Sequence, residues 1–163
     1  MRRIFFYLFG STVVFLLDTK LMKFLTIGDI VPDILVIWIV YIAIREGQSA
    51  GTIAGFAIGI TLDLVSGHDG MLGLGALVKT VSGFTAGYFY NENKTLQTLG
   101  GYQFLIALAV VSLVHNLIYF LILLQGTGVS PWGAIAFYGV PTTIYTAAFG
   151  LLPMFAFARK YLS

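Results

Sequence analysis

Six apolar stretches, separated from one another by only a few polar residues, constrain this chain more than any other feature. An α-helix needs about 20 mostly apolar residues to cross the hydrocarbon core of a membrane. The stretches predict helices at about 4–25, 30–45, 48–65, 71–90, 102–125 and 132–157. These helices would use most of the 163 residues, which leaves no room for a soluble domain. We therefore expect an all-α, polytopic integral membrane protein with six transmembrane helices in a single domain, 1–163.

The composition supports this class. Hydrophobic residues make up 58% of the chain and charged residues only 10%, against about 45–50% and 25% in soluble domains. A net charge of +2 without a basic stripe argues against nucleic acid as a partner. The chain has no cysteine, which excludes disulfides and thiolate metal sites. The expected surroundings are membrane lipid.

The placement of the cations predicts the orientation, because short loops rich in Lys and Arg stay cytoplasmic. Two arginines precede the apolar run 4–17, which lacks a small-x-small cleavage site, so an uncleaved first helix is expected. With the N-terminus inside, Lys20 and Lys23 lie outside. The six cations then placed inside are Arg2, Arg3, Arg45, Lys94, Arg159 and Lys160. An N-in/C-in arrangement follows.

Three prolines bear on the helix ends and shapes. Pro32 suits the first position of the helix 30–45, where its missing N–H costs nothing. Pro141 and Pro153 fall inside the expected helix 132–157 and should kink it.

Glycines recur at fourth positions on the expected helices 48–65 and 71–90. Residues four apart share one helix face, so each helix has a nearly bare face that a neighbouring backbone can approach closely. We expect the two faces to pack against each other within the chain; a groove for another subunit is the alternative. The glycines concerned are Gly51, Gly55, Gly59, Gly75, Gly83 and Gly87.

Lys79 lies near the middle of the expected helix 71–90, where an unpaired cation costs about 2.5 to 3.5 kcal/mol. An anion or a cavity should receive its ammonium group. At about 1.5 Å per residue, Asp63 and Asp18 lie at heights that a lysine side chain can reach. We expect Lys79 to pair with one of these carboxylates. A ligand or proton site and a water-filled vestibule are the alternatives.

The expected helix 102–125 carries a polar stripe, Ser112, His115, Asn116 and Tyr119, within an arc of about 100°. Lipid offers no hydrogen-bond partner, so the stripe must face protein or water, at about the height of Lys79. Hydrogen bonding between helices is the simplest role, and a proton relay or substrate site is the alternative. The stripe completes a candidate intramembrane polar cluster of Asp18, Asp63, Lys79, His115, Asn116 and Tyr119.

Motifs for catalysis or cofactor binding are absent from the sequence. There is no serine elbow, HExxH pair, P-loop or dinucleotide fingerprint. A lone histidine without a second His or a carboxylate on its own helix is a poor metal site. The sequence therefore predicts no catalytic residue, no cofactor and no metal.

Three segments in the middle of the chain carry a recognisable pattern: 32–36 (PDILV), 54–67 (AGFAIGITLDLVSG) and 72–77 (LGLGAL). Their order and spacing resemble the central signature of the MreD family, the rod shape-determining membrane proteins of bacteria. The resemblance covers about residues 30–90, with Pro32, Asp33, Asp63 and Gly67 as motif residues. Lys79 and the polar stripe do not belong to it.

The resemblance implies a non-enzymatic scaffold of the elongasome, the cell-elongation machinery that builds lateral peptidoglycan and maintains cell shape, in the bacterial inner (cytoplasmic) membrane. It implies MreC, a bitopic membrane protein, as the direct partner. Indirect partners would be the actin-like MreB, the glycosyltransferase RodA and a class B penicillin-binding transpeptidase. The implied fold resembles the S-components of ECF-type vitamin transporters, six helices around a cavity open to the outside.

The alternative function is a transporter subunit that captures a small molecule or vitamin, as S-components do. Lys79 and the aspartates expected outside favour it. Against it, the first helix has Phe6, Gly10 and Val14 in place of the alanines four apart with which S-components dock their energising partner. An intramembrane enzyme has little support, because no nucleophile and base lie at a readable spacing.

Overall fold

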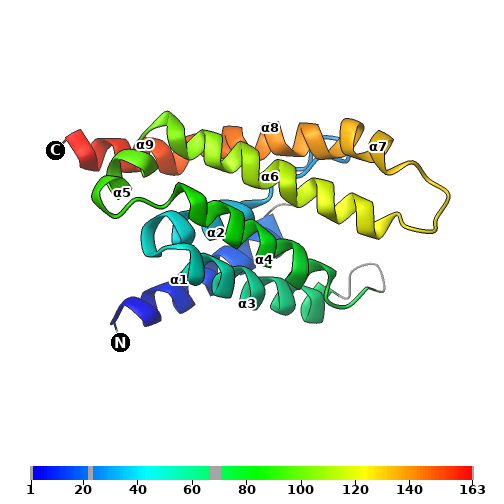
Figure 1. The fold of residues 1–163 in the computed structure, drawn as a ribbon, viewed down its shortest axis with the longest axis horizontal. Helices are drawn as coiled ribbons and strands as arrows, with labels where there is room; N and C mark the ends of the chain where they lie inside the picture. The colour runs from blue at the N-terminus through cyan, green and yellow to red at the C-terminus, as the bar shows by residue number, and fades with distance from the viewer. Residues whose placement is uncertain (1, 22–23, 67–70, 163) are drawn as a thin grey trace.

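The computed structural model describes residues 2–21, 24–66 and 71–162, and long helices dominate them, as the all-α expectation requires. Figure 1 shows the helices running along one long axis, with α6, α8 and α9 in one layer, α2, α3 and α4 in the next, and α1 at the outer edge. Both termini lie at the same end of the fold (Figure 1). The main helices are α1 (Arg2–Leu21), α2 (Ile34–Glu46), α3 (Gln48–Ser66), α4 (Leu74–Ala86), α6 (Tyr102–Leu123), α8 (Val140–Phe149) and α9 (Leu151–Leu162).

Within the described residues, three helical segments are long and apolar enough to cross a membrane: Gln48–Val65, Tyr102–Leu123 and Pro131–Arg159. By contrast, α2 and α4 have 13 residues each, which gives about 20 Å of helix. The membrane character of the chain follows from the three long segments. Six spans and their orientation stay a proposal.

The start of α2 corrects the expected helix 30–45. Asp33 is the N-cap residue, and its Oδ1 accepts a hydrogen bond of 2.9 Å from the N–H of Val36. Pro32 therefore precedes the cap, and the expectation that it occupies the first helical position is wrong. An aspartate can satisfy a free N–H of the first turn, which is why the helix begins after it.

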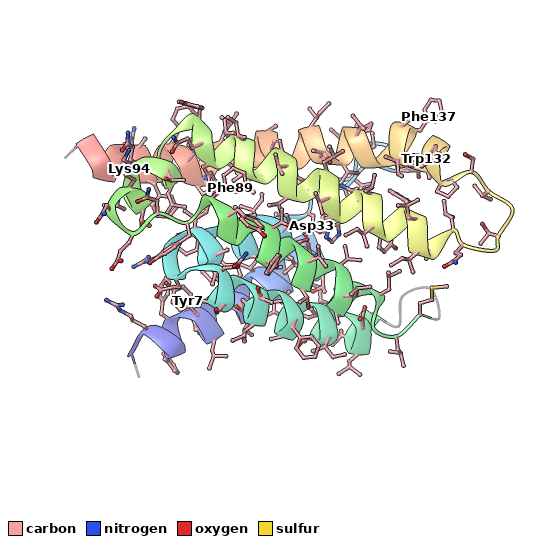
Figure 2. The ribbon with its side chains drawn as sticks, viewed as in Figure 1. Tyr7, Asp33, Phe89, Lys94, Trp132 and Phe137 are labelled. Carbon is pink, nitrogen blue, oxygen red and sulfur yellow. The ribbon has the colours of Figure 1, made fainter. Side chains whose placement is uncertain are left out.

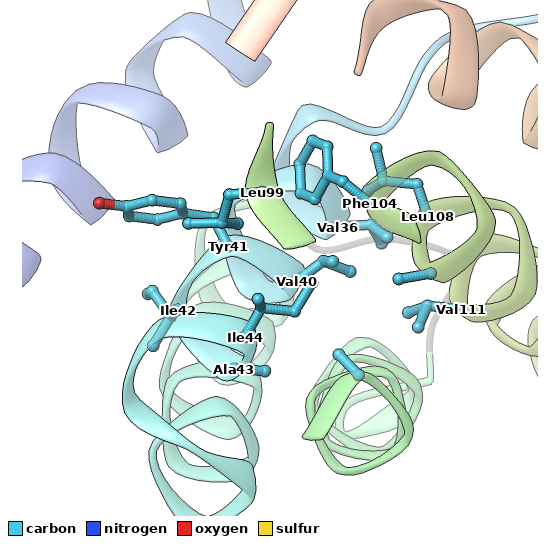
Figure 3. Packing of buried hydrophobic residues seen from close by; sticks show 12 residues of the cluster. Val36, Val40, Tyr41, Ile42, Ala43, Ile44, Leu99, Phe104, Leu108 and Val111 are labelled. Carbon is cyan, nitrogen blue, oxygen red and sulfur yellow. The ribbon is translucent and has the colours of Figure 1, made fainter. Parts of the chain in front are cut away.

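The core is built around α2, an almost continuous apolar helix in the middle of the fold. Its buried side chains meet Phe104, Leu108 and Val111 of α6 and Leu99 of the short helix α5 (Thr95–Leu99) (Figure 3). Helix α5 was not predicted from the sequence. The central place of α2 matters for the site, because it holds Asp33 at the inside of the fold.

Helices α3 and α4 form the most extensive helix contact among the described residues, and the glycine faces lie between them. A Cβ added at Gly55 would lie 2.1 Å from the backbone oxygen of Lys79, and one at Gly83 would lie 2.0 Å from that of Gly51. A Cβ at Gly59 would lie 2.5 Å from the oxygen of Gly75. Only glycine permits backbones this close, so these faces are occupied within the chain.

The expected helices 71–90 and 132–157 are each divided. Helix α4 begins at Leu74 after Gly73, whose φ is 100°, and a 3₁₀ turn, η3 (Gly87–Phe89), follows it. The last pass consists of α7 (Pro131–Ala134), the π-helical turn η5 (Ile135–Gly139), α8 and α9. A wider π turn just before Pro141 is a known response to a helix that must bend.

We predict that Gly55→Ala destabilises the fold, because its new methyl group would meet the α4 backbone and not a flexible side chain. The expected cost is about 1–3 kcal/mol, measured as a lower midpoint of thermal unfolding in detergent. Gly133→Ala is the matched control, since nothing lies within 4 Å of its added Cβ. Equal midpoints for the two variants would contradict the close α3–α4 contact.

Candidate functional site

A cavity of about 320 Å³ lies where α1 and α3 end and α2 and α4 begin. Side chains from all four of these helix ends line it, and α6 and α8 close it from the other layer. The polar lining residues are Asp18, Asp33, Asp63, Lys79, His115, Asn116, Tyr119 and Thr142. The structure thus brings the six residues of the candidate polar cluster around one cavity and adds Asp33 and Thr142 to them.

The centre of the site is an ion pair between Lys79 and Asp33. The Nζ atom of Lys79 lies 2.9 Å from Oδ2 of Asp33, and the lysine side chain is only 3% exposed. Figure 2 shows Asp33 near the centre of the fold. His115 Nε2 lies 3.5 Å from the same carboxylate oxygen. One carboxylate therefore joins α2, α4 and α6.

Further hydrogen bonds hold the Lys79–Asp33 pair and His115 in place. The N–H of Asp33 donates to Oγ1 of Thr146 on α8 at 3.0 Å. Oγ of Ser82, one turn after Lys79, lies 3.2 Å from Nδ1 of His115 and donates to the carbonyl of Val78. Since Asp33 also caps α2, each of its groups has a defined partner, as a buried carboxylate needs.

Asp63 does not pair with Lys79, so the expectation of that pair is wrong. Its two carboxylate oxygens accept three backbone N–H groups, from Gly73, Gly75 and Ala76, each at 3.0 Å. These donors are the free N–H groups at the start of α4, where the helix dipole also favours a negative charge. A motif aspartate on α3 therefore caps the next helix.

Asp18, the other expected partner, lines the cavity but forms no hydrogen bond or ion pair with another described residue. It interacts electrostatically with Asp33 and Lys79. The expected partners of Lys79 were chosen by height along straight helices, and Asp33 was expected inside the helix 30–45. For these two reasons the pairing with Asp33 was not predicted. The signal for Asp33 was present, since an aspartate directly before an apolar run is a typical N-cap.

The α6 stripe faces inward as expected from its polarity. Asn116 donates to the Ser112 carbonyl at 2.9 Å and to Oγ1 of Thr143 on α8 at 3.3 Å. The rings of His115 and Tyr119 are nearly parallel, with centroids 6.4 Å apart. The stripe supplies hydrogen bonds between α6 and α8 as well as cavity wall.

No cluster of candidate metal ligands is found in the part of the chain that the structure describes. Residues 2–21, 24–66 and 71–162 contain no group of three or more His, Cys, Asp or Glu side chains that could hold a metal ion. Gly67, a motif residue, and Lys23, a cation used for the orientation, lie outside the described residues.

Apolar helices long enough for a bilayer, packed around a buried ion pair, define a helical membrane protein. The family model of the rod shape-determining protein MreD matches residues 1–163, so this chain belongs to the MreD family. The chain is accordingly a non-enzymatic membrane protein of rod-shape determination. Comparison with curated proteins and with solved structures gave no match.

The Lys79–Asp33 pair predicts a specific pattern of stability. Asp33→Asn keeps a capping oxygen but leaves the buried ammonium group unpaired, so it should cost about 3–5 kcal/mol. Adding Lys79→Met should restore part of that loss, because no buried charge is then unmatched. The measurement is a double-mutant cycle of thermal unfolding midpoints in detergent.

Asp29→Asn serves as the control for that cycle, since Asp29 is exposed in the α1–α2 connection. Strictly additive losses in the double variant would mean that the two side chains are not energetically coupled.

Proposed function

We propose that the chain is a membrane scaffold of the bacterial cell-elongation complex. In this proposal it binds MreC in the inner membrane and acts through MreC on MreB, RodA and a class B penicillin-binding transpeptidase. The family match over residues 1–163 carries the proposal. Every fully buried side-chain nitrogen and oxygen atom of the described residues has a hydrogen-bond partner, which suits a structural role for most of the polar cluster.

The outer faces of the helices supply apolar surface for a partner helix. Large exposed side chains include Phe56 on α3 and Phe155 on α9. Two apolar grooves flank α1, one of about 650 Å³ against α3 and one of about 550 Å³ against α2, α8 and α9. The groove against α3 contains Ala50, Ala54 and Ala57. Small residues let a second helix approach closely in lipid, so these grooves support binding of a single transmembrane helix.

The proposed arrangement is six membrane passes with both termini in the cytoplasm. The two termini lie at one end of the fold (Figure 1). Lys94 lies toward that same end, whereas Trp132 and Phe137 lie toward the opposite one (Figure 2). Cations on the cytoplasmic side and aromatic rings at the membrane interfaces are the usual signs of such an orientation.

Reporter fusions test the orientation. Alkaline phosphatase, active only outside the cytoplasm, should be inactive when fused at either terminus and active when inserted in the α6–α7 connection near Thr127. Green fluorescent protein should give the reverse result. Termini on opposite sides would contradict the six-pass arrangement.

Site-directed crosslinking tests the partner. The chain has no cysteine, so single cysteines at Ile53, Ala57 and Leu152 can report which groove meets a cysteine in the transmembrane helix of MreC. We expect disulfide formation along one groove and none at the buried control position Leu108. Failure of MreC to co-purify with the intact chain, together with no crosslink at either groove, would reject the scaffold.

Capture of a small molecule for transport is the second candidate, and the cavity beside Lys79 is the observation that favours it. The first helix argues against it, because Gly10 is covered by Trp38 of α2 and not left open for an energising partner. An added Cβ there would lie 2.6 Å from the tryptophan ring. Uptake of a labelled compound that depends on this chain would favour the transport function.

A further inference from the structure

The cavity is lined by more carboxyl groups than lysine or arginine side chains among the described residues. Its carboxylates are Asp18, Asp33 and Asp63, and its lysine is Lys79. The Asp63 carboxylate is stabilised by hydrogen bonds from the backbone N–H groups at the start of α4, and Lys79 is paired with Asp33. The carboxyl group of Asp18 is left without an ion pair or hydrogen bond among the described residues, and both Asp33 and Lys79 act on it electrostatically. A second cation would remove this imbalance.

An aromatic ring lies on the same cavity. Tyr119 is nearly parallel to His115 and forms part of the cavity wall. The face of an aromatic ring attracts an ammonium group, and the attraction grows when water is excluded. The other walls include Val31, Leu35 and Val78, which suit a short hydrocarbon chain. The cavity thus offers an anion, a ring and an apolar surface together.

We propose that this cavity binds the ammonium group of a small amine, with Asp18 as counter-ion and Tyr119 as the ring against which it lies. The volume of about 320 Å³ is at the lower end for small-molecule pockets, which limits the ligand to a short chain. The amine has two possible sources, a free compound or the amino headgroup of a lipid. An anionic ligand does not fit, since the Lys79 ammonium group is buried against Asp33. The proposal does not depend on MreC binding.

The test uses the full chain in nanodiscs made of phosphatidylglycerol, which carries no amine. Thermal unfolding is followed with methylammonium, ethanolamine or propylammonium as chloride salts, and with sodium chloride at the same ionic strength. At least one amine should raise the unfolding midpoint in a saturable way, while sodium chloride does not. A second set of nanodiscs containing phosphatidylethanolamine distinguishes the sources. A higher midpoint there, with no further effect of free amine, identifies the lipid headgroup.

Asp18→Asn should weaken the response to amine at least tenfold in half-saturating concentration, while Asp29→Asn, the same change outside the cavity, should leave it unaltered. Tyr119→Leu should weaken the response as well, and it provides a second reading if Asp18→Asn does not fold. The proposal is overturned if no amine and no amino lipid changes the midpoint. It is also overturned if Asp18→Asn and Asp29→Asn respond equally to the amine. If Asp18→Asn does not fold, an unchanged response in Tyr119→Leu overturns it.

Discussion

The buried pair of Lys79 and Asp33 is the interaction on which the rest of the site depends. A lysine that is 3% exposed inside an apolar bundle must have an anion within hydrogen-bond distance. Asp33 supplies it while capping α2, accepting from Val36 and donating its own N–H to Thr146. Helices from both layers of the fold are thereby tied to a single residue, and their ends are brought around one cavity.

The close contact between α3 and α4 makes that pair possible. Gly55 lies against the backbone oxygen of Lys79, so the absence of a side chain on α3 lets α4 sit close to it. Asp63, one turn beyond Gly59 on the same face, then reaches the first N–H groups of α4. The glycine face and the capping aspartate therefore act together: the first sets the distance between the helices, and the second fixes where α4 begins.

A scaffold and a ligand-binding cavity are compatible in one small chain, because they use different surfaces. The proposed partner surface is the outward, apolar side next to α1, whereas the cavity lies among the helix ends. An amine bound between Asp18 on α1 and Tyr119 on α6 would connect α1 to the rest of the bundle. Helix α1 also borders both grooves.

The sequence by itself determined the helical class, the membrane setting, the glycine contact and six of the polar residues around the cavity, without Asp33 and Thr142, because apolar length, fourth-residue spacing and polarity in lipid are local properties. The family followed from the motif between residues 32 and 77. Only the tertiary structure decided which carboxylate pairs with Lys79, because that choice depends on where α2 begins and how far α4 is displaced along α3. It also decided that Asp63 caps α4, that the last pass is interrupted by a π turn, and that Asp18 is left facing a cavity. These outcomes come from distances between segments far apart in the chain, which no local pattern records.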